Sequence, residues 1–591
     1  MTARRGLPPR WVLASAVLLA AFPFLPFVGD YARDVGFYVG IYALLGLSLN
    51  LVLGEVGLFD LGHIAFYAIG AYTTAILNTR FHVPTLVLLP LAALAAAAFA
   101  ALVSAPIIHL RGDYFCIVTI GIGEIVRLVM VNNPFGLTGG PNGVNGIDHP
   151  SLGFAIQTPA AFYFLVWILV AAVVAALVGL QRARVGRAWN AIREDEVAAR
   201  ATGVDVRAYK LLAYVLGAGL AGVAGNLYAS KVMSIAPENF SFLESSLLFC
   251  IVLLGGVGSI PGVLLGAAAV VVFPEIFRGV ASYRLLFFGL ALMLTMVFRP
   301  GGLWPRRRRA VGLLDEDLVS AGSALVTQAR VAAPAKEDGP LLETRGATLR
   351  FGGVVAVNAL DLTVGPGRIS SLIGPNGAGK TAAFNLITGF YTPSSGSVLF
   401  EGRDVTGEAP HAIAALGIAR TFQHVRLFPA LTCLENAMSR AHGRRPGAWS
   451  ALLPTRAERA EERHTLETAS YRLNQMGLWP LRNELAKSLP YGKQRSLEVA
   501  RALAMGPKLL VLDEPCAGLN DKESAELMGI LRDFVAEGIT VLLVEHDMNV
   551  VMGVSDWITV MNQGSKIAEG TPKNVYDDPR VVEAYLGKGE A

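Results

Sequence analysis

The residues best suited to chemistry gather in the C-terminal half of the chain, in a glycine-rich loop and at the ends of two apolar stretches. The loop runs from Gly374 to Thr381 with the spacing Gly-x-x-x-x-Gly-Lys-Thr, directly after an apolar stretch at 369–373. Backbone N–H groups of such a loop surround phosphate oxygens, and the helix that follows adds the positive end of its dipole. Lys380 is expected to reach the terminal phosphates, and Thr381 to bind Mg²⁺. The expected phosphate-binding residues are Gly374, Asn376, Gly377, Gly379, Lys380 and Thr381.

Two carboxylates and a histidine follow the apolar stretches downstream. Asp513 and Glu514 end the stretch at 509–514, and His546 follows the stretch at 540–545. Stretches this apolar are typical of buried parallel strands, whose carboxyl ends meet at the ligand. We expect Asp513 to hold Mg²⁺ through water, Glu514 to orient or deprotonate the attacking water, and His546 to sense or stabilise the γ-phosphate. The pattern therefore predicts an ATP hydrolase with ATP and Mg²⁺ as cofactors.

The N-terminal half has the composition of a membrane domain. Residues 1–300 hold 18 Lys and Arg and 14 Asp and Glu, whereas residues 301–591 hold 32 of each kind. A spanning helix needs about 20 mostly apolar residues. The sequence predicts a polytopic α-helical membrane domain of about ten spans at 1–300, a flexible cytoplasmic linker at 301–340, and an α/β P-loop nucleotide-binding domain at 341–591. The expected spans are 11–28, 35–53, 61–78, 85–108, 114–131, 160–180, 211–230, 244–258, 262–280 and 284–298.

Basic residues orient these spans. Six arginines between 181 and 210 and four at 306–309 place both segments in the cytoplasm by the positive-inside rule. The turn-rich stretch at 132–159 has no Lys or Arg and is expected outside. Within the basic loop, residues 187–209 are predicted to be helical up to Gly203. A solvated surface helix is the alternative, but we favour a helix that docks on the ATPase through Ala191, Val197, Ala198 and Ala201.

Charged residues inside spans are costly and mark either a substrate path or pairing between helices, and both interpretations stay open here. Glu124 and Arg127 are spaced to pair on one helix face. Glu55, Asp60 and His63 cluster near the start of the third span. Small residues in the seventh span predict close helix packing, namely Gly217, Gly219, Gly222 and Gly225.

Composition argues against other classes of site. The four cysteines are far apart and form no Cys-x-x-Cys pair or Cys/His cluster, so neither a disulfide framework nor a zinc site is predicted. No basic stripe with interleaved aromatic residues is present, so no nucleic-acid partner is expected. The arginines at 306–309 follow Trp304, which suits the lipid headgroup boundary.

Together these motifs resemble the ATP-binding cassette family over residues 341 to about 587. The resemblance implies that Phe351 stacks on adenine and that Gln423, a catalytic residue and Mg²⁺ ligand, links the γ-phosphate site to the permease. It also implies that the segment at 489–495 is the signature, which contacts nucleotide bound to a second cassette through Tyr491 and Gly492. The departures from the general family pattern are Pro490, Tyr491 and Lys493 in the signature and Ala382 after the phosphate loop.

A closer resemblance is to bacterial branched-chain amino acid importers. Its ATPase motifs are Leu-Pro-Tyr-Gly-x-Gln-Arg at 489–495 and Glu-His-Asp-Met at 545–548. Its permease motifs are Leu-Asn-Leu-Val-Leu-Gly at 49–54, Gly-Glu-Ile-Val-Arg at 123–127 and Ala-Ile-Arg-Glu-Asp-Glu at 191–196. The resemblance implies an M-type permease fused to a G-type ATPase, which imports leucine, isoleucine or valine across the bacterial inner membrane with its ATPase in the cytoplasm.

The resemblance also implies partners. One cassette supplies only half of an ATP sandwich, so a second ABC ATPase or a second copy of this chain is expected, together with a second permease and an extracytoplasmic solute-binding protein. Alternatives within transporters are an importer of urea or short-chain amides and an ATP-gated channel or exporter. A soluble ABC-type translation ATPase is the remaining alternative, and it would lack the spans.

Overall fold

The computed structural model describes residues 19, 21–26, 28–110, 112–150, 156–276, 283–299, 301–306, 339–439 and 456–586. The chain divides into two compact units, which we call the permease unit (1–189 and 207–308) and the ATPase unit (190–206 and 309–591). Most of the expected first span at 11–28 and most of the expected linker at 301–340 lie outside the described residues.

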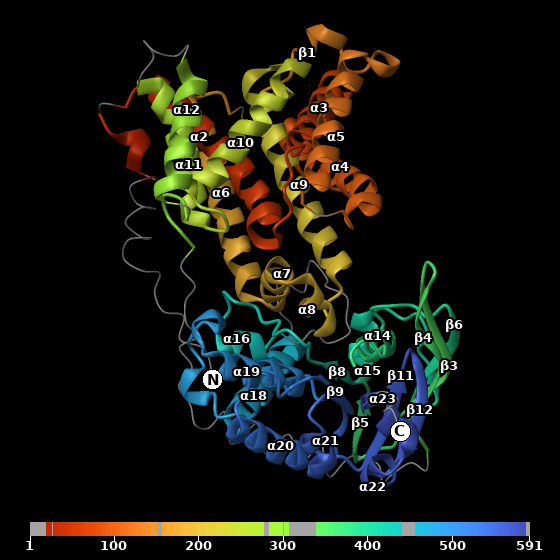
Figure 1. Ribbon diagram of the computed structural model, residues 1–591. Coiled ribbons are helices and arrows are strands. Elements are labelled where there is room, and N and C mark those ends of the chain that lie inside the picture. Colours follow the sequence, from red (N-terminus) through yellow and green to blue (C-terminus); the bar gives the residue numbers. More distant parts are fainter. Residues whose placement is uncertain are drawn as a thin grey trace. The chain divides into compact units, whose positions relative to one another are not determined.

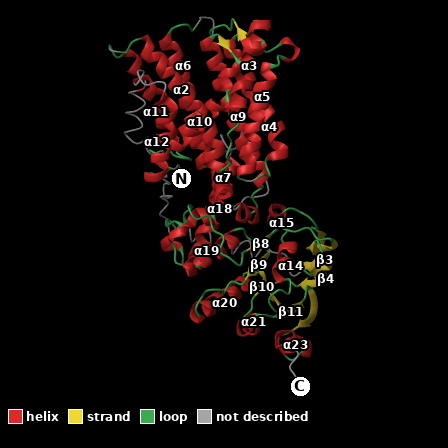
Figure 2. Cartoon of the chain, turned by 45° about the horizontal axis from the view of Figure 1, so that its top comes forward, coloured by secondary structure: helices red, strands yellow, loops and turns green. Residues whose placement is uncertain are grey.

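The permease unit is helical except for one short antiparallel strand pair (Figures 1 and 2). Helix α2 continues directly into a π-helical turn, η2, and the glycine-rich stretch after α10 ends that helix at Gly256, where φ is 124°. The elements are η1 (Phe22–Phe24), α2 (Asp30–Asn50), η2 (Leu51–Val56), α3 (Ile64–Phe81), α4 (Thr85–Ile107), α5 (Asp113–Val131), η3 (Pro134–Gly136), η4 (Gly140–Asn142), β1 (Val144–Asn145), α6 (Pro159–Arg182), α7 (Arg184–Glu194), α9 (Val206–Val232), β2 (Ser234–Ile235), η5 (Pro237–Phe240), α10 (Phe242–Gly255), α11 (Ile260–Ile276) and α12 (Arg284–Phe298).

Six helices in the described part of the chain are long and apolar enough to cross a membrane. Two expected spans, at 61–78 and 284–298, are helical as α3 and α12 but do not belong to these six. The 15 residues of α12 extend about 22 Å, which is less than the roughly 30 Å of a hydrocarbon core. A count of about ten spans therefore stays a prediction. The six are Asp30–Val56, Thr85–Ile107, Asp113–Val131, Pro159–Gln181, Val206–Val232 and Pro237–Gly255, with a shorter apolar helix at Ile260–Glu275.

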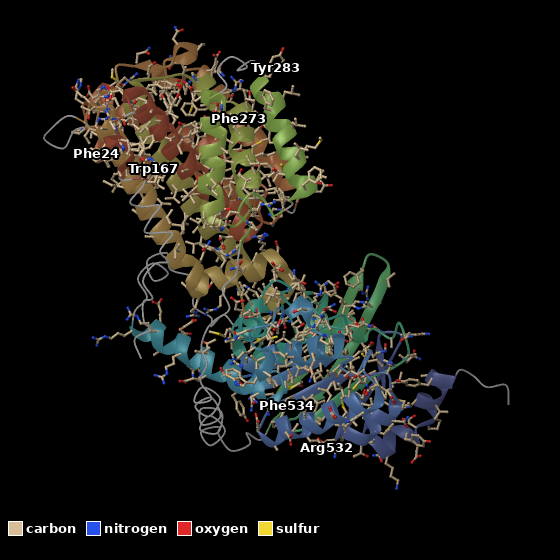
Figure 3. All side chains as sticks on the ribbon, turned by 90° about the vertical axis from the view of Figure 1, so that its left-hand side faces the viewer. Phe24, Trp167, Phe273, Tyr283, Arg532 and Phe534 are labelled. Atoms are coloured by element: carbon tan, nitrogen blue, oxygen red, sulfur yellow. The ribbon has the colours of Figure 1, made fainter. Side chains whose placement is uncertain are left out.

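Small residues let these helices approach closely, as the sequence predicted. A Cβ on Gly222 of α9 would lie 2.6 Å from the carbonyl oxygen of Ala92 in α4, and one on Gly225 would lie 2.3 Å from the carbonyl oxygen of Tyr67 in α3. On the other side of the unit, the Trp167 indole N–H of α6 donates to the backbone oxygen of Gly36 in α2 at 3.1 Å (Figure 3). Both glycines of α9 therefore stand where any side chain would separate two helices.

The ATPase unit contains two sheets. The larger one has the order β12-β11-β5-β10-β9-β8, parallel except for β12, and the smaller antiparallel sheet has the order β4-β3-β6-β7. The strands are β3 (Leu342–Phe351), β4 (Val354–Val364), β5 (Ile369–Ile373), β6 (Ser395–Phe400), β7 (Arg403–Asp404), β8 (Ile418–Arg420), β9 (Leu509–Asp513), β10 (Thr540–Val544), β11 (Trp557–Asn562) and β12 (Ser565–Gly570). The helices are α8 (Glu196–Ala201), α14 (Lys380–Ile387), α15 (Pro410–Leu416), α16 (Cys433–Ala437), α18 (Arg456–Gln475), η7 (Trp479–Leu481), η8 (Ala486–Ser488), α19 (Tyr491–Ala504), α20 (Asp521–Ala536), α21 (Met548–Val554), α22 (Pro572–Tyr576) and α23 (Pro579–Leu586).

The central strands are buried on both faces. In β9, Leu509 and Val511 belong to a core shared with α14 and the smaller sheet, whereas Leu510 and Leu512 belong to a core shared with α18, α19 and α20. All five residues of β9 are buried, and the same holds for β5 and β10. Burial on both faces explains why β9 and β10 are mostly apolar, and it fixes the strand ends that carry the polar residues.

Candidate functional site

The phosphate loop joins β5 to α14. Gly374, Gly377 and Gly379 have φ values of 153°, 82° and 95°, which side chains rarely adopt. A Cβ on Gly374 would lie 2.1 Å from the carbonyl oxygen of Met561, and one on Gly379 would lie 2.3 Å from that of Ala356. Gly374 and Gly379 are therefore required by packing as well as by backbone conformation, and Gly377 by backbone conformation alone. A loop of this kind presents its N–H groups to an anion.

Lys380 is buried at the first turn of α14. Its Nζ donates to the backbone oxygens of Gly374 at 2.6 Å and Pro375 at 3.1 Å, so the ammonium is held over the loop. Burial lowers the pKa of Lys380, while the carboxylates of Glu514 and Asp513 oppose that shift. Asn376 and Thr381 are exposed in the same loop, where a ligand can reach them.

The carboxyl end of β9 brings three predicted residues together. The Gln423 side-chain N–H donates to Glu514 Oε2 at 3.2 Å, and His546 Nδ1 lies 3.9 Å from the same oxygen. Glu514 has φ of 48°, a strained value for a residue with a side chain, and its backbone N–H donates to Val544 of β10 at 2.9 Å. The sheet thus fixes Glu514 in an unfavourable backbone conformation that aims its carboxylate at Gln423 and His546.

Asp513 is suited to a hard cation. Its side chain is 1% exposed, and its Oδ1 has no hydrogen-bond partner among the described residues. Burial raises the pKa of Asp513, while Arg420, whose Nη2 lies 3.6 Å from Oδ2, acts in the opposite direction. Mg²⁺ is commonly held by one or two carboxylates together with phosphate oxygens and water, so a lone buried carboxylate oxygen beside the phosphate loop fits this ion. The hydroxyl of Thr381 and the amide oxygen of Gln423 are ligands of the same oxygen type.

Arg420 is a site residue that sequence reasoning missed. It ends β8, and its Nη1 donates to Asn385 Oδ1 of α14 at 2.6 Å and to Oγ1 of Thr388, which follows α14, at 2.8 Å. Burial lowers its pKa to about 10, against the effect of Asp513. Arg420 therefore ties the phosphate-loop helix to the carboxylate of β9. Its position directly before the Thr-Phe-Gln segment at 421–423 was the available signal.

Phe351 lies at the end of β3 and is 47% exposed. The ring of Tyr391 meets it edge to face, with ring centroids 5.1 Å apart. The pair forms an aromatic surface on which a base can stack. Tyr391 was not predicted, because nothing in its spacing from the phosphate loop marks it.

The signature segment begins α19, with Pro490 as the residue before its first turn. Tyr491 is 46% exposed, and its ring covers Gly518, where a Cβ would lie 2.9 Å from the ring. Gly492 follows in the first turn, so its N–H belongs to the positive end of this 14-residue helix. Tyr491 therefore has a packing partner in its own cassette, which accounts for an aromatic residue at this position. Ala382 packs partly buried against the core under α14.

The segment at 187–209 differs from the single helix expected there. The structure has two helices, α7 and α8, and α9 begins at Val206. The break falls at Asp195, which is extended and whose side chain accepts the N–H groups of Val197 at 2.8 Å and Ala198 at 2.9 Å. A capped helix start at this point ends the preceding helix. Gly203 follows α8 with φ of 85°, close to the expected stop.

Residues 190–206, which we call the docking segment, pack with the ATPase fold. Arg426 Nη1 lies 2.9 Å from Asp195 Oδ2, and the Ala430 N–H donates to Glu194 Oε2 at 3.2 Å. Helix α8 packs against α15. The predicted docking therefore occurs, but polar and charged contacts carry much of it in addition to the apolar face.

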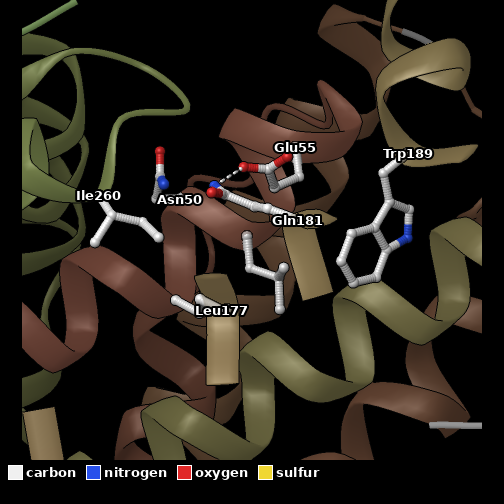
Figure 4. A pocket seen from close by; sticks show the side chains of 7 residues that line it. Asn50, Glu55, Leu177, Gln181, Trp189 and Ile260 are labelled. Carbon is white, nitrogen blue, oxygen red and sulfur yellow. Dashed lines mark hydrogen bonds between the residues drawn. The ribbon is translucent and has the colours of Figure 1, made fainter. Parts of the chain in front are cut away.

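In the permease unit, Glu55 has different bonding partners from the pair Asp60 and His63, which lies close to it in sequence. Glu55 is buried in η2, accepts the Gln181 side-chain N–H at 2.6 Å and pairs with Arg306 at 3.0 Å, beside an enclosed cavity of about 10 Å³ (Figure 4). His63 lies 2.9 Å from Asp60 through Nδ1 and contacts Ser48 through Nε2. Glu55 and His63 thus each have protein partners, and this favours structural pairing over a substrate path. Glu124 and Arg127 pair directly on one face of α5, as predicted.

Comparisons with known proteins agree with this division. Residues 32–297 match the branched-chain amino acid transport system permease component family, and residues 357–517 match the ABC transporter family. Residues 565–591 match the branched-chain amino acid ATP-binding cassette transporter family. The chain is 45% identical over 251 residues to the high-affinity branched-chain amino acid transport ATP-binding protein BraF of Pseudomonas aeruginosa, and the match covers 42% of this chain and 98% of BraF.

The chain belongs to the branched-chain amino acid family of ABC transporters. It is also 40% identical over 322 residues to the transport system permease protein LivM of Escherichia coli K12, covering 50% of this chain and 75% of LivM. A solved nucleotide-free ATP-binding cassette from an ABC transporter is 33% identical, covering 42% of this chain and all of that one, with a TM-score of 0.37. Relatives that are named as separate permease and ATP-binding proteins thus correspond to one chain here.

Proposed function

We propose that this family member imports branched-chain amino acids, the leucine, isoleucine and valine class, with permease and ATPase in one chain. The observation that carries the proposal is the docking segment. Residues 190–206 belong to the stretch that matches the permease family, yet they pack with the ATPase fold through Asp195 and Arg426. An ATPase held to permease sequence by such a contact is built to drive a membrane step rather than to act alone.

In the proposed hydrolysis step, Lys380 and the loop glycines bind the phosphates, and the ring of Phe351 stacks on adenine. Glu514 orients and deprotonates the attacking water, while Gln423 and His546 hold its carboxylate. Mg²⁺, when bound, would supply charge neutralisation at the phosphates. The residues of this chain that would hold it are Thr381, Gln423 and Asp513.

The assembly and its placement belong to the same proposal. A second ATPase, or a second copy of this chain, presents its signature across the dimer interface, as Tyr491 and Gly492 of this chain do for the other site. A second permease and an extracytoplasmic solute-binding protein complete the importer. The arginine-rich loops support an orientation in the bacterial inner membrane with the ATPase in the cytoplasm. The proposed domains are the permease at 1–300, the linker at 301–340 and the ATPase at 341–591. The docking segment belongs to the permease in sequence but packs with the ATPase fold.

Uptake in proteoliposomes that contain the full chain, its partner subunits and its binding protein tests the proposal. We expect ATP-dependent leucine uptake that requires the binding protein and that the Glu514→Gln variant abolishes while it still binds ATP. Glu526→Gln, the same chemical change on an exposed position of α20, is the matched control and should transport normally. Uptake by Glu514→Gln at the wild-type rate would contradict the ATPase as motor. Uptake of urea or short amides in place of leucine would contradict the substrate assignment, and uptake without the binding protein would favour a channel or exporter.

A further inference from the structure

Three charged side chains are buried along one face of α19. Arg495, Glu498 and Arg501 stand three residues apart and are 1%, 0% and 2% exposed. Burial raises the pKa of the Glu498 carboxyl, against the effect of the two arginines. A hydrophobic side chain would be less costly at each position, so a packing role alone does not explain this cluster, which we call the buried triad.

Glu498 holds the backbone on both sides of Gln423. Its Oε1 accepts the N–H groups of Phe422 at 3.3 Å and of Arg426 at 3.2 Å, and its Oε2 accepts Arg495 Nη1 at 3.0 Å. The segment at 422–426 therefore closes around one buried carboxylate. A displacement of Arg426 would therefore change its distance to Glu498 Oε1, the same oxygen that accepts the N–H of Phe422.

Arg495 joins the same segment to the catalytic carboxylate. Its Nη1 donates to the Phe422 carbonyl at 2.6 Å, and its Nη2 donates to the carbonyl oxygens of Asp513 at 3.0 Å and of Glu514. Its Nε donates to the carbonyl of Pro515 at 3.3 Å. One guanidinium thus bridges the start of the 422–426 segment and the strained turn that carries Glu514.

The other end of this network reaches the docking segment. Arg426 pairs with Asp195 at 2.9 Å, and the charge of Asp195 also acts on Arg501, whose guanidinium lies 5.1 Å from the ring of Phe428. Within the ATPase unit, Asp195 therefore pairs with the guanidinium of Arg426, and the backbone N–H of the same residue donates to Glu498. Glu498 in turn accepts Arg495, which donates to the backbone oxygen of Glu514, so the connection passes through the side chain and backbone of Arg426 and otherwise through hydrogen bonds.

We propose that Glu498 and Arg495 are positioning residues that convert a displacement of the docking segment into a displacement of Glu514. Fully satisfied buried networks are stiff, so they transmit a shift where a hydrated contact would absorb it. Glu498 and Arg495 make no hydrogen bond to the phosphate loop at 374–381. They bond instead to the backbone of residues 422–426 and 513–515. The inference deepens the proposed function and rests on it for its physiological role, but the network itself is measurable without transport.

Amide hydrogen exchange in the full-length chain tests the network. Asp195→Asn removes the charge that pairs with Arg426 but keeps an oxygen that can cap α8. We expect this substitution to raise exchange severalfold in peptides that cover 420–428 and 511–517 of the otherwise wild-type chain. When Asp195→Asn is combined with Glu498→Gln, it should change exchange at 420–428 but no longer at 511–517. Arg495→Lys replaces Glu498→Gln if that variant folds poorly, with the same expectation.

Arg472→Lys provides the matched background. Arg472 pairs with Glu537 at 2.5 Å and is 4% exposed, so it is a buried ion pair of the same kind that contacts neither segment. In this background Asp195→Asn should still raise exchange at 511–517. The inference is overturned if Asp195→Asn leaves 511–517 unchanged in the wild-type chain, or if it raises exchange there equally in the Glu498→Gln and Arg495→Lys backgrounds. A chain that shows the coupling but moves no solute with all partners supplied would contradict the proposed function and support the inference.

Discussion

The contact between Asp195 and Arg426 permits a quantitative prediction about docking. Asp195 has two separable roles, because one oxygen caps α8 through Val197 and Ala198 while the other pairs with Arg426 at 2.9 Å. Asn caps helices about as well as Asp, so Asp195→Asn removes only the ion pair, whereas Asp195→Ala removes both roles. The two substitutions therefore separate docking charge from local helix stability.

The structure sets the size of each effect. The Arg426 side chain is 43% exposed, so solvent screens the pair, and we assign it about 0.5–1 kcal/mol. The lost pair corresponds to a roughly two- to fivefold loss of a rate that depends on docking. Loss of the cap adds about 1 kcal/mol, so Asp195→Ala should cost roughly ten- to thirtyfold.

The assay is leucine uptake in proteoliposomes with the complete set of partners, at low and at high salt. Asp195→Asn, Arg426→Gln and the double variant should lower uptake to the same extent, because each removes the same pair. High salt should reduce the difference from wild type. Additive losses in the double variant, or an Asp195→Asn defect as large as that of Asp195→Ala, would refute the assignment of the pair to docking.

Two further predictions concern packing and titration. Gly222→Ala should lower the thermal unfolding temperature of the detergent-solubilised chain, because its Cβ would lie 2.6 Å from the Ala92 carbonyl oxygen and such overpacking costs about 1–3 kcal/mol. Gly219→Ala is the control and should be neutral or stabilising, because the atom nearest to its Cβ would lie at 3.5 Å. Equal unfolding temperatures of the two variants would contradict the contact between α9 and α4. Burial, reinforced by the charge of Glu545, raises the pKa of the Cys516 thiol from 9.0 to about 12. In a variant that keeps Cys516 as its single cysteine, maleimide labelling near pH 8 should be about a thousandfold slower than labelling of an ordinary thiol, and its rate should still rise above pH 10. A labelling rate that levels off near pH 9 would contradict this environment.

The sequence predicted the catalytic strands well because their signals are local. An apolar stretch that ends in Asp513 and Glu514 can be read from adjacent residues, and the structure indeed places Gln423 and His546 beside Glu514. The count of about ten spans stays a prediction, because six helices among the described residues have the length and apolarity of a lipid crossing and α3 and α12 are not among them.

The missed features are of two kinds, a local helix cap and contacts between residues distant in sequence. Asp195 was placed inside a helix because its neighbours favour helix, although an Asp before an apolar turn is a typical cap and was the available signal. The buried triad on α19 was missed because charges three residues apart ordinarily mark a solvated face. Only the neighbouring backbone at 422–426 and 513–515 makes burial of Arg495 and Glu498 possible, and no spacing on α19 encodes it.

Fusion of permease and ATPase changes what the docking contact must achieve. Between separate subunits, the free energy of docking has to offset the entropy of association, whereas here both sides belong to one polypeptide, so their effective concentration is high. A partly exposed ion pair of about 0.5–1 kcal/mol, together with the contacts of Glu194 and α8, then has less entropy to offset. The stronger, buried hydrogen bonds of Glu498 and Arg495 lie further inside the ATPase unit, between that contact and Glu514. A weak surface contact joined to a stiff interior is the arrangement expected where the permease has to signal its conformation to the ATPase without being held permanently in one state.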